Sequence, residues 1–135
     1  MAGERVKLQV RERERRGSAD ARRLRREGFS IWPFDEPGWP LVIEIYPRAL
    51  TGAVNKSKRE AREQHLITHC PDFSEATRDV AASSEDSFDA AVSALRMWEH
   101  RDELLSLRVA DDPLTALEGA IWQPTTLSPA ESVPR

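Results

Sequence analysis

The feature that most constrains the fold is a short apolar run at residues 41–46, bounded by Pro40 and Pro47. Its residues are mostly β-branched or aromatic, a pattern typical of a strand that is buried on both faces of a sheet. Glu44 lies inside this run. Because an isolated charge is costly to bury, its carboxylate must be paired, protonated or bound to a cation. The run therefore predicts a buried strand that presents one acid to a site.

Length and composition favour a single soluble domain, because 135 residues allow one substantial core. No apolar run approaches the roughly 20 residues that cross a bilayer. The charged start, MAGERVKLQV, lacks the apolar centre of a signal peptide. The one cysteine, Cys70, excludes an internal disulfide and is compatible with a reducing compartment. We therefore expect a cytoplasmic protein that has no membrane partner.

Charge is distributed unevenly along the chain. Residues 1–26 contain ten Lys and Arg against four Asp and Glu, whereas the remainder contains ten against nineteen. A basic arm on an acidic body suits a phosphate backbone that lies next to a carboxylate cation site. The alternative is a solvated, frayed terminus without a binding role.

The pattern of elements divides the chain into three parts. Residues 1–17 have a weak period-two pattern followed by RERERR, which predicts a poorly defined basic arm. Residues 18–124 carry the signals of one folded domain. Residues 125–135 are rich in Pro, Ser and Thr, and we expect a disordered tail.

The first half of the domain is expected to combine a helix with strands. Ser18 is a good N-cap and Gly28 suits the C′ position, so they delimit a helix. Residues 29–34 predict a strand that Pro33 limits, and residues 35–38 predict a turn before the central strand. The two strands form either a hairpin or neighbours connected in another way.

The second half is expected to be mainly helical. Ser57 and Glu60 predict a capping box for a helix that ends near residue 69, and residues 72–82 predict an irregular connector with one helical turn. A long helix over residues 85–107, capped by Ser83 or Ser84, carries an apolar stripe that we expect to pack on the sheet. The stripe consists of Phe88, Ala91, Val92, Leu95 and Trp98. A short helix follows Asp112 and Pro113 and ends at Gly119. All four tryptophans are expected in the core.

Two acids at the start of the long helix, Asp86 and Asp89, are three residues apart and share one face. Together with Glu44 they form a set of hard oxygen ligands that suits Mg²⁺ or Mn²⁺ and phosphoryl substrates. The alternative is that first-turn acids only complement the helix dipole.

Two basic groups are candidate contacts for the phosphates of nucleic acid. They are Arg22, Arg23 and Arg26 in the first helix, and Lys56 and Lys58 after the central strand. The alternatives are that the arginines complement the C-terminal end of the helix and that the lysines form a solvated face.

Three blocks of the sequence resemble one family. WPFDEPGWPLVIEIYPRALTG, SEDSFDAAVSAL and LEGAIWQP occur in the order found in the C-terminal half of the domain-of-unknown-function 429 family, a group of predicted nucleases. The resemblance covers residues 21–124. It implies a ribonuclease-H-like α/β fold and, by position, a strand carboxylate at Glu44 and helix carboxylates at Asp86 and Asp89. In that family two divalent cations would activate a water molecule for phosphodiester hydrolysis.

The first strand of such a fold, which carries its central aspartate, has no counterpart in residues 1–28. We therefore expect an incomplete ribonuclease-H-like domain with two or three strands and three or four helices. Its hydrolase activity is expected to be weak or absent, and an uncovered sheet edge predicts self-association. The alternatives are a non-enzymatic module that binds nucleic acid or protein through residues 11–26, and a gene fragment without independent function.

Overall fold

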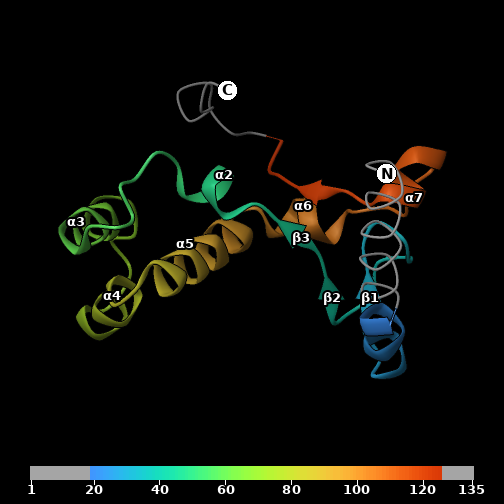
Figure 1. Cartoon of the computed structure of the whole chain (residues 1–135), viewed down its shortest axis with the longest axis horizontal. Coiled ribbons are helices and arrows are strands. Elements are labelled where there is room, and N and C mark those ends of the chain that lie inside the picture. Colours follow the sequence, from blue (N-terminus) through green and yellow to red (C-terminus); the bar gives the residue numbers. More distant parts are fainter. Residues whose placement is uncertain (1–18, 126–135) are drawn as a thin grey trace, which may run out of the picture. The chain divides into compact units, whose positions relative to one another are not determined.

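The computed structural model describes residues 19–125 (Figure 1). It is mixed α/β, about 54% helical, with a few short strands, so the predicted α/β class is confirmed at this level. The chain divides into two compact units. Within the described residues, unit 1 comprises residues 19–44 and Leu107–Ala120, and unit 2 comprises Ile45–Ser106 and residues 121–125.

Unit 1 begins with the predicted helix, which the structure describes over residues 19–26; its predicted cap, Ser18, lies outside the described residues. The helix ends where Gly28 adopts a φ of 92°, and the backbone N–H of Phe29 returns to the carbonyl of Leu24. Positive φ is a conformation that glycine adopts without a steric cost. The predicted C′ glycine is therefore confirmed.

Two short strands follow this helix and pair in parallel. They are β1 (Ser30–Ile31) and β2 (Leu41–Val42), with Ser30 opposite Leu41 and Ile31 opposite Val42. A hairpin would be antiparallel, so the second of the two predicted arrangements is observed. The strand predicted over residues 29–34 is too long, because the N–H groups of Phe34 and Asp35 both turn back to the carbonyl of Ile31.

The last part of unit 1 contains α7 (Pro113–Glu118). Asp112 accepts a hydrogen bond from the backbone N–H of Thr115 at 2.8 Å, and the helix ends at Gly119, as predicted. None of its residues is buried. The preceding segment is tied to the rest of unit 1 by hydrogen bonds from Trp32 Nε1 to the carbonyl of Arg108 and from the N–H of Ala110 to the carbonyl of Pro33.

The predicted buried strand at residues 41–46 is wrong. The structure has β2 and, after a break, β3 (Glu44–Ile45), which pairs with β4 (Ile121–Trp122). Within residues 19–125 each of these strands has one neighbour in a two-stranded sheet. The run is not buried on both faces, because Glu44 and Tyr46 are exposed and the other four residues of 41–46 are half-buried.

Unit 2 is mainly helical and contains five helices between residues 45 and 106 (Figure 1). They are α2 (Pro47–Thr51), α3 (Arg59–His69), α4 (Glu75–Ala82), α5 (Glu85–Glu99) and α6 (Arg101–Leu105). Their shared core consists of Leu66, Cys70, Ala81, Ala82, Phe88 and Val92. These residues lie on α3 and its C-terminal end, on α4 and on α5, so the core is formed by helices packed on helices.

The apolar stripe of the long helix packs on other helices rather than on a sheet. Phe88 and Val92 are buried in the core, and Ala91 and Leu95 pack against it, as the 3.6-residue period predicts. The prediction that the stripe packs on the sheet is wrong, because the core residues that it contacts lie on α3 and α4. Trp98, which was expected in the core, is 66% exposed.

Helix boundaries agree with the sequence where a side chain caps the backbone. Ser84 caps α5 by accepting from the N–H of Ser87, as predicted. The capping box at Ser57 is wrong, because the hydroxyl of Ser57 donates to Asn55 and α3 begins after Lys58. The expected connector over residues 72–82 instead contains α4, which Ser74 caps.

The long predicted helix is interrupted at His100, whose φ of −102° and ψ of 22° depart from helical values. The structure therefore divides it into α5 and α6.

Candidate nucleic-acid interface

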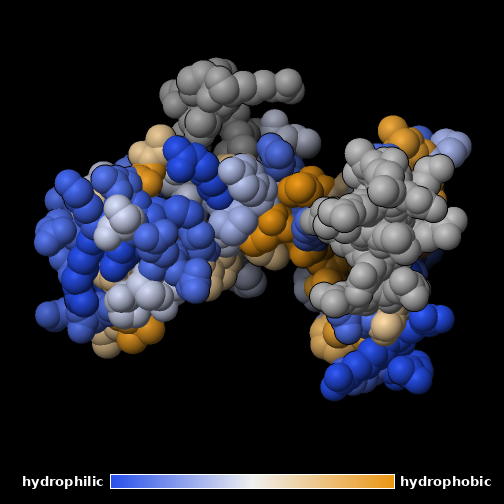
Figure 2. All heavy atoms as spheres, viewed as in Figure 1, coloured by the Kyte–Doolittle hydropathy of each residue, from blue (hydrophilic) through white to orange (hydrophobic). Residues whose placement is uncertain are grey.

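The helix over residues 19–26 presents arginines to solvent. Ala21 and Leu24 are half-buried and face the rest of unit 1, whereas all four arginines of the helix are exposed. Such a segregation follows from the helical period, which places residues three and four apart on the same face. In Figure 2 this segment forms a group of hydrophilic, dark blue side chains at the lower right.

Three of the four arginines line one hollow on the surface of unit 1. Its volume is about 530 Å³ and its described walls are Ala19, Arg22, Arg25 and Arg26. The three arginines follow an i, i+3, i+4 pattern, so their guanidinium groups leave the helix on one side. Ala19 has a small side chain and leaves space at the same face. The described walls of the hollow therefore carry positive charge.

Arg25 is held in position by an ion pair. Its Nε lies 3.0 and 2.8 Å from the two carboxylate oxygens of Asp35, which also accepts from the backbone N–H of Ile31 at 3.0 Å. The hydrogen bond from Arg25 is the main cause that lowers the pKa of Asp35, and the same bond raises the pKa of Arg25. Through Asp35, the pair connects the basic helix to Ile31 at the end of β1. The side chain of Arg25 is therefore held in one orientation at the wall of the hollow.

Arg23 points elsewhere. Its Nε pairs with Glu27 one turn later at 3.1 Å, its side chain is 74% exposed, and it is not among the residues that line the hollow. The structure thus brings together Arg22 and Arg26 of the predicted nucleic-acid contacts and separates Arg23 from them.

The predicted lysine contacts belong to unit 2. The ammonium group of Lys56 lies 2.7 Å from both carboxylate oxygens of Asp89, so its charge is balanced inside the protein. The carbonyl of Lys56 also accepts a hydrogen bond from Arg62, a buried arginine whose guanidinium binds the carbonyl of Ala82 as well. Lys58 is exposed at the N-terminal end of α3.

The three predicted metal ligands are distributed over both units. Glu44 belongs to unit 1, and Asp86 and Asp89 belong to unit 2. Asp86 is exposed, while Asp89 accepts from Lys56. Among residues 19–125 the structure contains no group of three His, Cys, Asp or Glu that could hold a metal ion. The three predicted ligands therefore do not form such a group.

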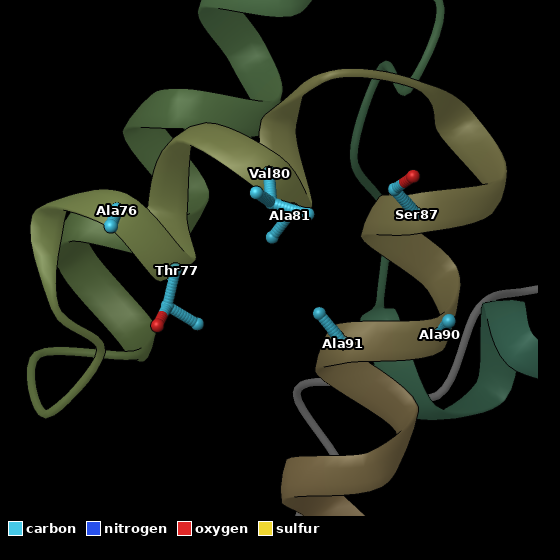
Figure 3. Close-up of a pocket in the computed structure, with 7 residues that line it drawn as sticks. All are labelled: Ala76, Thr77, Val80, Ala81, Ser87, Ala90 and Ala91. Carbon is cyan, nitrogen blue, oxygen red and sulfur yellow. The ribbon is translucent and has the colours of Figure 1, made fainter.

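A second hollow lies in unit 2 between α4 and α5 (Figure 3). Its volume is about 690 Å³, and its described walls are Ala76, Thr77, Val80, Ala81, Ser87, Ala90 and Ala91. These side chains are methyl groups, one isopropyl group and two hydroxyls, and none of them carries a charge. This groove therefore offers no acid, base or cation to a ligand.

One residue that lines the hollow, Arg25, was not among the predicted contacts. Residues 22, 25 and 26 span an arc of about 100° around the helix axis, and so do the predicted residues 22, 23 and 26. Helical spacing alone therefore does not distinguish the two groups. The exclusion of Arg23 from the hollow is a property of the fold.

Comparison with models of known families, with curated proteins and with solved structures found no match. Within residues 19–125, no helix combines the length and the apolar character that a bilayer span needs.

Proposed function

We propose that this protein is a non-enzymatic module that binds the phosphate backbone of nucleic acid through the basic helix of unit 1. The observation that carries the proposal is the hollow into which Arg22, Arg25 and Arg26 turn from one helix face. Guanidinium groups match phosphate oxygens in a bidentate geometry and keep their charge at any physiological pH. Contacts of this kind supply most of the affinity in sequence-independent binding of nucleic acid.

The arginines have different parts in this proposal. Arg25 is a positioning residue, since its guanidinium is bound by Asp35 and holds the helix on β1. We assign the phosphate contacts to Arg22 and Arg26, which lie on the same face one turn apart. Arg23 lies outside the hollow and provides a matched comparison on the same helix.

The test compares Arg26→Gln with Arg23→Gln, which change the same charge three residues apart. Binding of a fluorescein-labelled oligonucleotide is measured by anisotropy, and circular dichroism confirms that both variants fold. We expect Arg26→Gln to weaken binding about fivefold, corresponding to about 1 kcal/mol, because the contact is exposed and contributes no more than a typical hydrogen bond. Arg23→Gln should stay close to the unmodified protein. Equal losses in both variants would mean that the hollow has no special role.

A metal-dependent nuclease with a ribonuclease-H-like fold is a second proposal. Its support is the placement of Asp86 and Asp89 at adjacent turns at the start of α5, together with the mixed α/β class. The described residues contain no group of three potential metal ligands, so no catalytic step is derived from them. Mn²⁺ titrated against the protein and against the Asp86→Asn/Asp89→Asn double variant tests this proposal. Tighter binding by the unmodified protein would support it, and equal, negligible affinity would remove it.

The cytoplasmic location and the self-association through a sheet edge remain predictions.

A further inference from the structure

Trp39 is one of the most exposed large side chains in unit 1. It lies in the connection between β1 and β2, and 69% of its surface is accessible, although the sequence favoured a core position. The backbone on both sides of it is fixed. The carbonyl of Pro40 accepts from the N–H of Ser30 at 3.0 Å, and a Cβ on Gly38 would lie 3.0 Å from the hydroxyl oxygen of Ser30. Trp39 is therefore an exposed indole on a constrained segment.

This segment lies close to the end of the basic helix. Ser30, whose N–H binds the carbonyl of Pro40 beside Trp39, follows Arg26 by only four residues, and the turn at Gly28 lies between them. Asp35, in the same connection as Trp39, binds Arg25 of the helix. This ion pair joins the connection that contains Trp39 to the helix that lines the hollow. An exposed aromatic ring and a cluster of guanidinium groups are combined on one unit.

We propose that Trp39 is a stacking platform for an unpaired base of single-stranded nucleic acid whose phosphates are held by Arg22 and Arg26. This inference rests on the function proposed above and adds the class of nucleic acid. Bases have flat π faces that stack on aromatic side chains, and a cationic surface beside the ring tracks the backbone. The bases of a duplex are stacked on one another inside the helix, so the indole selects strands whose bases are accessible.

The test uses the full chain and two kinds of probe. A single-stranded oligothymidylate and oligouridylate of about twelve nucleotides, within the usual site size, are compared with a mixed-sequence duplex of equal length. The variants are Trp39→Ala, Trp39→Phe and Trp98→Ala; the last removes an exposed tryptophan of unit 2 and is the matched control.

We expect Trp39→Ala to lower the affinity for both single strands about 5- to 100-fold, the range found for loss of one base–aromatic stack. Affinity for the duplex should not change. Trp39→Phe should retain most of the single-strand affinity, since it keeps a ring, and Trp98→Ala should bind as the unmodified protein does.

The outcomes separate the two proposals. If the protein binds nucleic acid and Trp39→Ala has the same affinity as Trp98→Ala, the stacking platform is wrong and the phosphate-binding function stands. If single strands and duplex lose affinity equally in Trp39→Ala, stacking on an unpaired base is also contradicted. If the unmodified protein binds none of the three probes, both proposals fail.

Discussion

Asp35 connects three parts of unit 1 through one carboxylate. It accepts from Arg25 in the basic helix and from the backbone of Ile31 in β1, and its own segment leads toward β2. Charge-assisted hydrogen bonds of this kind favour the ionised form of the acid, and the pKa of Asp35 in the folded protein is lowered for that reason. Its ionisation and the stability of unit 1 are therefore linked.

The linkage gives a prediction for stability at low pH. Because folding lowers the pKa of Asp35, the stabilisation is fully present above the unfolded value of 3.8 and is lost as the pH falls through the folded value. In Asp35→Asn that contribution is missing at every pH. The free energy of unfolding, measured with urea at neutral pH and near pH 3, should therefore fall more in the unmodified protein than in Asp35→Asn. An equal fall in both proteins would contradict the linkage.

Ser93 gives a second prediction at the scale of one residue. It is buried in α5, and its hydroxyl has no hydrogen-bond partner among the described residues. Burying an unsatisfied hydroxyl costs free energy. Ser93→Ala should raise the free energy of unfolding by about 0.5–1 kcal/mol, to which the helix propensity of alanine contributes. Ser93→Cys has a propensity close to that of serine, so a gain in that variant as well would assign the effect to the buried hydroxyl. A loss of stability in both variants would contradict this account.

At the scale of elements, a half-buried ion pair joins the loop before α3 to α5. The side chains of Lys56 and Asp89 are 17% and 23% exposed, and Arg62 binds the same loop through the carbonyl of Lys56. A pair screened from solvent to this degree is stronger than one on an open surface. The loop is thus fixed to α5 by both a side chain and a main-chain contact.

A double-mutant cycle measures this contact. Lys56→Ala, Asp89→Ala and the double variant are unfolded with urea, and the interaction energy is obtained from the three differences. We expect a coupling of about 1–2 kcal/mol, in the range of hydrogen bonds to charged groups. A coupling within error of zero would show that Asp89 is available to other ligands, as the metal-site prediction requires.

How far the elements could be predicted depended on the kind of signal. Asp112 and Ser84 accept from backbone N–H groups within their own helices, so local sequence was sufficient to place those boundaries. The strand at residues 41–46 could not be predicted correctly, because burial on two faces depends on elements that pack on both sides of the sheet, and the local pattern does not contain them. The apolar stripe of α5 was predicted correctly from Phe88 to Leu95, because its period is local, whereas Trp98 is exposed. The helices on which the stripe packs, α3 and α4, are determined by the tertiary fold and not by the local pattern.

At the scale of the whole molecule, the described chain has a helical core in unit 2 and a small parallel pair of strands beside a basic helix in unit 1. The basic character of the helix was evident from composition. Helical spacing did not decide between Arg23 and Arg25 as the third member of the group, and both this choice and the contact between Arg25 and Asp35 depend on the fold of the following strand and turn. The exposure of Trp39 could not be predicted from the apolar residues next to it, because the burial of a side chain depends on the tertiary fold.

The most direct test of the central claim is the salt dependence of binding to a single-stranded oligonucleotide, in the unmodified protein and in the Arg22→Gln/Arg26→Gln variant. Each phosphate contact on a single strand contributes about −0.7 to the slope of log K against log salt concentration. Since two arginines are assigned to phosphates, the slope of the variant should be shallower by about 1.4. Identical slopes in the two proteins would contradict the assignment of the hollow to nucleic acid.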